Sequence, residues 1–246
     1  MNESTFCIEM KNLASDGRQI GCRVIPFDTI DSTNTYALRE GQLGDVIVAD
    51  RQTLGRGRVG RTWFSEPGLG LWFTAVVAEP TEGLTFASAL AVREAVADRC
   101  ALQIKWPNDL LYKGKKVCGI LVENRNGATA VGIGLNVHHR REDFPEELRE
   151  KAGSLSSVAG GEWDRAALLR DVLNALDRKV MLLTSGGFET IRRDWADACN
   201  LIGRRIRNGA LEGVVTEIDG RGAIILDTPS GVERIISGEI GFLDGD

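Results

Sequence analysis

The sequence is poor in the residues that build metal centres and disulfide frameworks. It has two histidines, adjacent at His138 and His139, and five cysteines that are far apart and in no Cys-x-x-Cys arrangement. Adjacent residues on a strand point to opposite faces, so the histidines are a poor start for a metal site, and a third histidine for a nucleophilic site is lacking. We expect the histidines to mark a strand end that reaches solvent and the cysteines to be buried or incidental thiols.

Long apolar runs and a strong charge bias are also missing. No segment approaches the length of a membrane span, and residues 1–12 carry scattered charges instead of the apolar core of a signal peptide. The 30 basic and 35 acidic residues give a net charge of −5, so no overall basic field attracts nucleic acid. With 246 residues, 43% of them hydrophobic, the chain can bury a substantial core. We therefore predict a cytoplasmic globular protein that binds neither DNA nor membranes.

Strand and helix signals alternate through the first 200 residues. β-rich runs with glycine or proline at their boundaries predict strands at 22–28, 45–50, 69–78, within 104–123 on both sides of a Lys-Gly turn, and at 128–137. Helical spacing and capping residues predict helices from residues 31–34 to Gly41, at 85–100, at about 163–183 and at about 187–199. We expect the helix at 85–100 to pack across a sheet.

The pattern changes after Asn200. From there, short β-rich runs are separated by Asn-Gly, Asp-Gly and Ser-Gly pairs, which favour hairpin turns. The sequence therefore predicts a small all-β domain over residues 201–246. Because a chain of this length has a marginal core of its own, we expect it to lean on the larger domain.

The segment GRGRVGR, residues 55–61, contains a complete G-x-G-x-x-G. A strand precedes it, and Glu79 lies about 20 residues on, where a ribose-binding acid of a dinucleotide fold would lie. In such a fold a helix must begin directly after the last glycine, because its N-terminus holds the pyrophosphate. Residues 61–70 contain aromatic residues, a proline and two glycines instead. The sequence thus argues against a dinucleotide site.

The arginines of this segment suggest another role. Arg56, Arg58 and Arg61 supply planar donors for carboxylate or phosphate, and the glycines between them leave the backbone free to move. A solvated basic loop would explain one such arginine better than three in seven residues, and here Trp63 and Phe64 follow. We predict a loop that closes over an anionic ligand.

A second polar segment is KWPND, residues 105–109, followed by Lys116 and Gly119. Proline interrupts regular strand pairing, so Asn108 and Asp109 can project from a strand end toward a site. There the carboxylate could hold Mg²⁺ that bridges phosphates, and Lys116 would add a point charge for the same phosphates. A hairpin with a polar tip explains this segment equally well.

Together these segments resemble the biotin–protein ligase family, which attaches biotin to a lysine of a carrier domain. The resemblance spans most of the chain. It is carried by D-S-T-N at 31–34, R-Q-T-x-G-R-G-R-x-G-R-x-W at 51–63, K-W-P-N-D at 105–109, K-x-x-G-I-L-V-E at 116–123 and G-I-G-x-N-V at 132–137, and by the small β-rich C-terminal region. Each motif is weak alone, but the set in this order is highly specific.

The resemblance implies an α+β fold, in which helices pack on the mixed β-sheet of a catalytic domain like that of class II aminoacyl-tRNA synthetases and biotin–lipoate ligases. It places a biotin- and ATP-binding domain at 1–200 and an SH3-like β-barrel at 201–246. The implied reaction has two steps. The carboxylate of biotin attacks the α-phosphorus of ATP, which gives biotinyl-5′-AMP and pyrophosphate, and the carrier lysine then attacks the mixed anhydride. Because a carboxylate and a polyphosphate repel each other, the site needs fixed cations that act in the transition state.

The resemblance also assigns roles residue by residue. Lys116, Arg58 and Asp109 are implied as catalytic residues, and Asp109 also as the Mg²⁺ ligand. The implied biotin-binding residues are Ser32, Thr33, Asn34, Gln52, Arg56, Gly57, Arg58, Lys116, Gly119 and Gly134. The implied nucleotide-binding residues are Arg58, Arg61, Trp63, Asn108, Asp109, Lys116 and Asn136.

Bifunctional members of the family carry an N-terminal winged helix-turn-helix, whereas only about 30 residues precede the D-S-T-N motif here. We therefore expect a monofunctional ligase without a DNA-binding domain. Its implied partner is a biotin carboxyl carrier protein or the biotinyl domain of a carboxylase. Monomer and homodimer both stay open. The alternatives are a lipoate–protein ligase or octanoyl transferase of the related fold, and a non-catalytic biotin sensor, which would not need Lys116 and Asp109 together.

Overall fold

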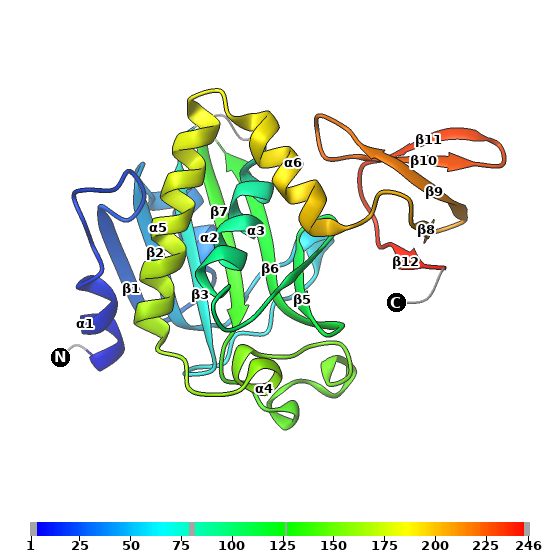
Figure 1. Ribbon diagram of the computed structural model, residues 1–246. Coiled ribbons are helices and arrows are strands. Elements are labelled where there is room, and N and C mark those ends of the chain that lie inside the picture. The colour runs from blue at the N-terminus through cyan, green and yellow to red at the C-terminus, as the bar shows by residue number, and fades with distance from the viewer. Residues whose placement is uncertain (1–3, 79–81, 126, 244–246) are drawn as a thin grey trace.

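The protein is described by a computed structural model that covers residues 4–78, 82–125 and 127–243, and its strands form two separate sheets (Figure 1). The larger sheet has seven strands in the order β1-β2-β3-β7-β6-β5-β4. They are β1 (Arg23–Ile30), β2 (Asp45–Gln52), β3 (Gly70–Val77), β4 (Gln103–Lys105), β5 (Asp109–Tyr112), β6 (Lys115–Arg125) and β7 (Ala128–Asn136). β1 and β2 are parallel and all other neighbours are antiparallel, which confirms the expected mixed sheet.

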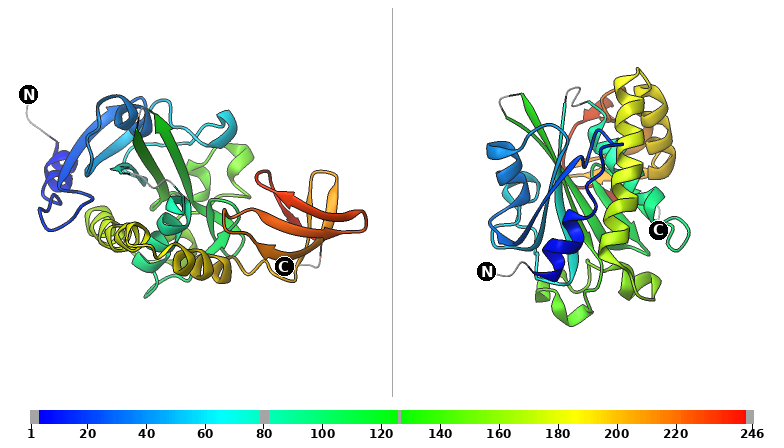
Figure 2. Two further views of the ribbon diagram at one scale, coloured as in Figure 1. Left: turned by 90° about the horizontal axis from the view of Figure 1, so that it is seen from above. Right: turned by 90° about the vertical axis from the view of Figure 1, so that its left-hand side faces the viewer.

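Helices cover the two faces of this sheet unequally. Three of them, α3 (Leu84–Ala95), α5 (Arg165–Thr184) and α6 (Phe188–Cys199), lie over one face (Figures 1 and 2). The opposite face carries the short helix α2 (Thr33–Glu40). Two more short helices, α1 (Thr5–Lys11) and α4 (Leu155–Ala159), lie beside β1 and at one end of the sheet. The large helices bury the apolar side chains of their face, while α2 covers a smaller apolar cluster that includes Ala37, Ile47 and Val76 on the opposite face.

Helix α3 is shorter than the sequence predicted. The apolar spacing favoured a helix over 85–100, but the helix ends at Ala95 and residues 96–99 form turns. The chain folds back there because Val96, Cys100 and Leu102 all reach the core, and Arg93 Nε donates to the Leu102 carbonyl at 2.9 Å. Periodicity alone cannot show this, since a buried turn and a buried helix present the same apolar residues.

The second sheet is built from the hairpins that the sequence predicted. Its strands are β8 (Arg205–Asn208), β9 (Leu211–Ile218), β10 (Ile224–Thr228), β11 (Gly231–Ile235) and β12 (Gly241–Phe242), in the order β11-β10-β9-β8-β12. All neighbours are antiparallel. This small antiparallel sheet agrees with the expected SH3-like domain, and in the pairing of the described strands β11 and β12 are its edges.

The second sheet packs against the larger sheet and its helices through a few specific contacts. The buried indole of Trp106 donates to the Gly222 carbonyl at 2.8 Å, and Arg192 Nη1 donates to the Ile218 carbonyl at 2.6 Å. A Cβ on Gly222 would lie 2.1 Å from the Phe86 ring, so the turn before β10 fits only because this residue is glycine. These contacts attach the small sheet beside the strand ends of the large one.

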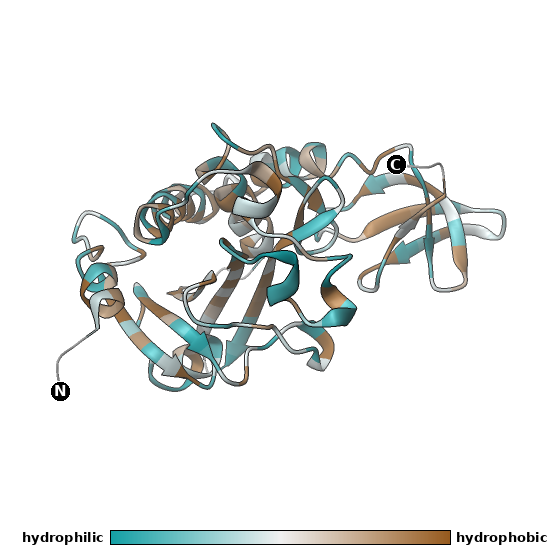
Figure 3. Ribbon diagram, turned by 90° about the horizontal axis from the view of Figure 1, so that it is seen from below, coloured by the Kyte–Doolittle hydropathy of each residue, from teal (hydrophilic) through white to brown (hydrophobic). Residues whose placement is uncertain are grey.

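Apolar residues follow the strands of the central sheet and the helices packed on it (Figure 3). None of the helices within 4–78, 82–125 and 127–243 is both long and apolar enough to cross a membrane. Of the five cysteines, Cys22 is exposed and the others are buried.

Candidate active site

The floor of the candidate site is a glycine-rich patch on the α2 face of the sheet. Strand register sets Trp72, Gly134 and Gly119 side by side, with Thr74, Gly132 and Leu121 in the next row on the same face. The indole of Trp63 lies on this floor: a Cβ would come within 2.5 Å of it from Gly134 and 2.8 Å from Gly119. The missing side chains therefore open space for a flat ring against the sheet.

A buried polar cluster borders this floor where α2 begins. The Thr33 backbone and hydroxyl both point to Gln52 Oε1, at 2.9 and 3.1 Å, and the Thr74 hydroxyl lies 2.8 Å from Thr33 Oγ1 and 2.6 Å from Asn34 Oδ1. Ser32, Thr33, Asn34 and Thr74 are all nearly inaccessible to solvent. Ser32 caps α2 by accepting from the Thr35 amide. Four of the residues expected at a biotin site are thus fixed in one place.

Residues 53–69, here called the flap, cross the same face. Their first part is a narrow hairpin closed by hydrogen bonds from the Gly57 amide to the Arg61 carbonyl (2.7 Å) and from the Trp63 amide to the Gly55 carbonyl (2.8 Å). Its tip is a single 3₁₀ turn at Arg58–Gly60, in which Val59 has a φ of 54°. No α-helix follows Gly60, which confirms that the segment is not a dinucleotide-binding turn. Glu79 lies outside the described residues.

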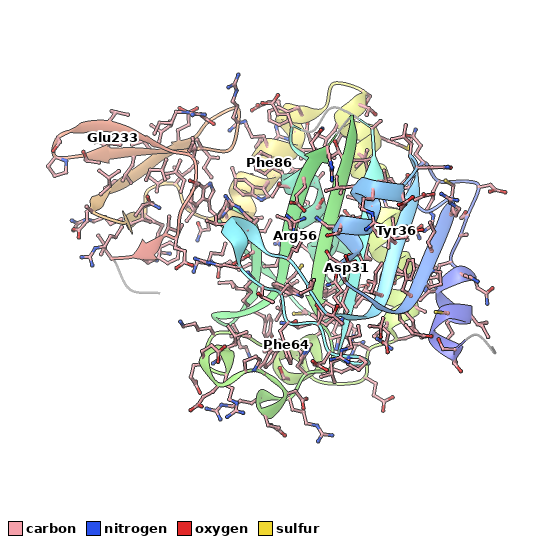
Figure 4. The ribbon with its side chains drawn as sticks, turned by 180° about the vertical axis from the view of Figure 1, so that it is seen from behind. Asp31, Tyr36, Arg56, Phe64, Phe86 and Glu233 are labelled. Atoms are coloured by element: carbon pink, nitrogen blue, oxygen red, sulfur yellow. The ribbon has the colours of Figure 1, made fainter. Side chains whose placement is uncertain are left out.

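Each flap arginine meets a partner on a different element. Arg56 pairs with Glu123 of β6 at 2.8 Å, and Arg58 Nη1 donates to Asn108 Oδ1 at 3.2 Å. Arg61 pairs with Glu239 of the small sheet at 2.6 Å, and its guanidinium lowers the pKa of that carboxyl. Figure 4, which views the α2 face, shows Arg56 over the strands, between α2 and the flap tip. The flap thus spans the floor from β6 to the second sheet.

Lys116 and Asp109 meet next to the floor. Lys116 Nζ lies 2.6 Å from Asp109 Oδ1 and 5.2 Å from the centre of the Trp63 ring. Their side chains are 34% and 24% exposed, so both stay accessible to a ligand. Asp109 is paired with Gly119 in the sheet, and Asn108 is held by a hydrogen bond from its Nδ2 to the Ile120 carbonyl at 2.6 Å. From the sequence, KWPND could be either part of a binding site or the polar tip of a hairpin. In the structure its last two residues lie beside the floor.

The chain after β7 supports Lys116 from below. The Lys116 amide donates to the Lys151 carbonyl at 2.8 Å, and the Gly153 amide donates to the Lys116 carbonyl at 3.0 Å. Asn136 is buried and donates to the Gly153 carbonyl at 3.0 Å, so its amide faces this supporting loop. The backbone at Lys116 is therefore fixed while its side chain remains at the site.

Next to the site, a cavity of about 350 Å³ opens between the flap, the β5–β6 region and the small sheet. Its lining includes Arg58, Asn108, Phe86 and Arg221. No cluster of three or more His, Cys, Asp or Glu residues suited to a metal ion occurs in the described part of the chain. Any metal here would depend on one carboxylate and on oxygens of a substrate.

His139 does not reach solvent as the sequence predicted. It is 1% exposed, and its ring stacks on Phe144 with centroids 4.6 Å apart and meets the edge of Trp72 at 5.8 Å. Neither ring nitrogen has a hydrogen-bond partner. Burial therefore lowers the pKa of His139 to about 4. The expectation was wrong because the loop after β7 turns back over the strand end and covers it.

This buried histidine gives a testable pH dependence. Its pKa of about 4 in the folded protein lies below the usual value near 6.5, so the unfolded chain takes up a proton that the folded chain refuses. Above about pH 6.5 the histidine is neutral in both the folded and the unfolded chain, so it costs no stability. As the pH drops from there toward 4, only the unfolded chain is protonated, and the stability of the fold decreases. We expect His139→Leu to remove about 2 kcal/mol of this loss across that range. Denaturant unfolding at several pH values measures it, and a variant with the parent's slope would contradict the assignment.

Several residues of the site were missed at the sequence level. Thr74, Gly132, Ser65 and Trp72 line the floor or its polar border, and Glu123 holds Arg56. One signal was present: Thr74 is the only polar side chain inside the apolar run at 69–78. Its place in the site follows only from the strand register, which sets Thr74 opposite Gly132 and next to Asn34.

Comparison with known proteins gives a consistent result. The family described as biotin/lipoate A/B protein ligase matches residues 26–139, and the biotin protein ligase C terminal domain matches residues 199–243. A bifunctional ligase/repressor BirA of Bacillus subtilis is 34% identical over 241 residues, which cover 90% of this chain and 74% of the relative. A biotin–[acetyl-CoA-carboxylase] ligase of Paracoccus denitrificans is also 34% identical, with coverages of 86% and 97%. The structure of a biotin protein ligase from Aquifex aeolicus in complex with biotin and ATP aligns with a TM-score of 0.79 at 30% identity, over 89% of this chain and 97% of that one.

Proposed function

We propose a mechanism on the premise that this chain belongs to the biotin/lipoate A/B protein ligase family, within which it is a biotin protein ligase. The protein activates biotin with ATP and biotinylates a carboxylase. The proposal goes further: the intermediate is biotinyl-5′-AMP, the acceptor is one lysine of a biotin carboxyl carrier protein or biotinyl domain, and AMP and pyrophosphate are released. The observation that carries it is the Lys116–Asp109 pair beside a glycine floor, under a flap with three arginines.

Biotin combines a compact fused bicyclic ring, which has a planar polar ureido edge, with an apolar tail that ends in a carboxylate. We assign the ring to the space between the Trp63 indole, which lies on the floor at Gly119 and Gly134, and the polar cluster, and its polar edge to that cluster of Ser32, Thr33, Asn34 and Gln52. A buried cluster of this kind discriminates well, because a ligand without matching donors and acceptors leaves buried groups unpaired. Arg56 and Gly57 of the flap complete this subsite from above.

For the first step, the biotin carboxylate must approach the α-phosphorus of ATP against like charge. Lys116 stands at the edge of the floor and is the cation that meets both groups, while Arg58 reaches the same place from the flap tip. Fixed charges of this kind act most strongly as charge shifts from the carboxylate to the leaving pyrophosphate. Arg61, Trp63 and Asn108 are assigned to the nucleotide side, and Asn136, whose amide is bound to the Gly153 carbonyl, is assigned there as a support for the adjoining loop.

Asp109 also fits a Mg²⁺ ion. Magnesium is usually held by one or two carboxylates together with waters and substrate phosphates, so a single accessible carboxylate beside the phosphate-binding cations suits it. When bound, Mg²⁺ would neutralise phosphate charge. Lys116 then serves to orient Asp109, at 2.6 Å, before the nucleotide arrives.

In the second step the amine of the acceptor lysine attacks the carbonyl carbon of the mixed anhydride. A bond forms between that carbon and the amine nitrogen, the bond to the phosphate oxygen breaks, AMP leaves, and the amine loses a proton. The anhydride must be shielded from water until then, which the flap accomplishes by covering the floor.

The domain division and setting are part of the proposal. We assign biotin and ATP binding to residues 1–200, and to residues 201–246 a separate domain whose Glu239 and Gly222 contact the flap and the strand ends. We place the reaction in the cytoplasm, with no DNA or membrane as partner. Light scattering of the purified chain decides between monomer and homodimer.

Loss of the flap charge should release the intermediate. We expect Arg58→Gly to raise the dissociation rate of biotinyl-5′-AMP at least about tenfold, because one charge-assisted hydrogen bond is typically worth enough for that factor. The dissociation rate is measured by adding an excess of unlabelled adenylate to protein loaded with labelled adenylate and following the loss of label. Arg39→Gln is the matched control, since Arg39 lies exposed on α2 and pairs only with Glu40. Equal rates in Arg58→Gly and parent would mean that Arg58 does not hold the intermediate.

The substrate itself is tested by transfer to an apo carrier domain. The purified protein is incubated with ATP, Mg²⁺ and either labelled biotin or labelled lipoate, and the label on the carrier lysine is counted. We expect incorporation from biotin and little from lipoate. Transfer from lipoate alone would support a lipoate–protein ligase instead, and binding of biotin without pyrophosphate release would support a sensor.

A further inference from the structure

Glu123 joins the flap to the buried polar cluster, although it carries no assigned role. Its Oε1 accepts from Arg56 Nη2 at 2.8 Å, and its Oε2 accepts from Asn34 Nδ2 at 3.0 Å. The Glu123 side chain is only 22% exposed, whereas Glu239, the partner of Arg61, is 71% exposed. A carboxylate with both oxygens engaged and little solvent contact fixes its partner far better than an exposed one.

The contacts of Glu123 belong to a longer chain of hydrogen bonds. Asn34 donates to Glu123, so its Oδ1 is left to accept from the Thr74 hydroxyl at 2.6 Å. That hydroxyl has one proton, and an amide oxygen has none, so the proton lies toward Asn34 and Thr74 Oγ1 accepts from its neighbour Thr33. The single Thr33 hydroxyl proton is then used toward Thr74, so Gln52 is held by the Thr33 amide.

The chain ends in the flap again. The Thr33 amide donates to Gln52 Oε1 at 2.9 Å, and Gln52 Nε2 donates to Ser65 Oγ at 2.9 Å. Ser65 Oγ in turn lies 3.2 Å from the Trp63 carbonyl. One continuous network therefore connects two positions of the flap, Arg56 and Ser65, by a path through the proposed biotin-recognition residues.

We propose that Glu123 is a positioning residue that holds Arg56, and with it the flap, in the closed geometry that retains biotin and its adenylate. That biotin and its adenylate are the retained ligands rests on the proposed function, whereas the contact between Glu123 and Arg56 does not. Filling the polar cluster with a ligand fixes Asn34, Asn34 fixes Glu123, and Glu123 fixes Arg56. Without Glu123, a ligand bound in the polar cluster no longer restrains the position of Arg56 and the flap.

The test compares Glu123→Gln with Glu239→Gln. Glutamine keeps the shape of Glu123 and can still accept from Asn34, but it loses the charge that holds Arg56. We expect Glu123→Gln to increase hydrogen exchange of the flap peptide 53–66 in the empty protein about tenfold, and to raise the KM for biotin by a similar factor with kcat changed less than twofold. Glu239→Gln breaks an ion pair whose partners are 68% and 71% exposed and should leave both readouts within about twofold.

A double mutant separates positioning from general structure. In an Arg56→Gln background the Glu123→Gln change should add no further flap exchange, because its partner is already gone. A full additional effect there would show that Glu123 acts through Asn34 alone and would overturn the proposal, as would unchanged flap exchange in the single variant. Absence of biotin-dependent pyrophosphate release in the parent would count against the proposed function, while flap exchange would still decide the role of Glu123.

Discussion

Replacing Lys116 with alanine is expected to lower the rate of biotinyl-5′-AMP formation by about 10²–10³-fold, the usual cost of removing one preorganised charge from a transition state. Lys116 lies 2.6 Å from Asp109 and at the edge of the glycine floor, where the carboxylate and the α-phosphate must meet. Its backbone is held by hydrogen bonds to Lys151 and Gly153, which alanine keeps. The fold should therefore survive the change.

The assay is biotin-dependent exchange of labelled pyrophosphate into ATP, with the melting temperature recorded in parallel. Lys115→Ala is the matched control, since Lys115 is the neighbouring cation but pairs with Glu150 on the surface. It should retain nearly full exchange activity. Normal exchange in Lys116→Ala, with an intact melting curve, would remove Lys116 from the mechanism.

Adding one methyl group to the glycine floor should lower enzyme activity almost as strongly as the loss of Lys116. In Gly134→Ala the new Cβ would lie 2.5 Å from the Trp63 ring, so that ring must move outward from the floor and into the space assigned to biotin. A shift of about 1 Å at a reacting centre can cost about 10²-fold, and we expect a loss of that order in kcat/KM for biotin. Strand pairing of Gly134 with Trp72 and Gly119 uses only backbone atoms and remains possible.

Gly220→Ala serves as the control for that substitution. Gly220 lies in a turn of the small sheet, and a Cβ there would meet nothing within 4 Å. Steady-state kinetics over a range of biotin concentrations, with ATP saturating, compares the two variants. An unchanged kcat/KM in Gly134→Ala would place the biotin ring elsewhere.

The sequence predicted the parts of the site that depend on composition and order. The lack of a helix signal after Gly60 argued correctly against a dinucleotide turn, whereas anion binding by the three arginines stays a prediction. Most strands were predicted close to their observed bounds, because alternating β-branched residues and turn dipeptides are local signals. The family resemblance then supplied the function, which local signals alone could not.

What the sequence could not give depends on which strands lie side by side. The glycine floor exists because β3, β7 and β6 are neighbours in a register that aligns Trp72, Gly134 and Gly119. The burial of His139 depends on a loop that returns over the strand end, and the end of α3 on a turn that is as apolar as the helix. Glu123 stood inside a recognised motif, but its partners Arg56 and Asn34 are far from it in sequence.

The most direct test of the account isolates the intermediate. The protein is mixed with biotin and α-labelled ATP without acceptor, separated rapidly from free nucleotide, and then given an apo carrier domain with no ATP. The account predicts that labelled biotinyl-5′-AMP stays bound to the protein, and that the carrier lysine is biotinylated as labelled AMP is released. Retention of ATP alone, or biotinylation only after fresh ATP is supplied, would contradict a ligase that forms and shelters an adenylate.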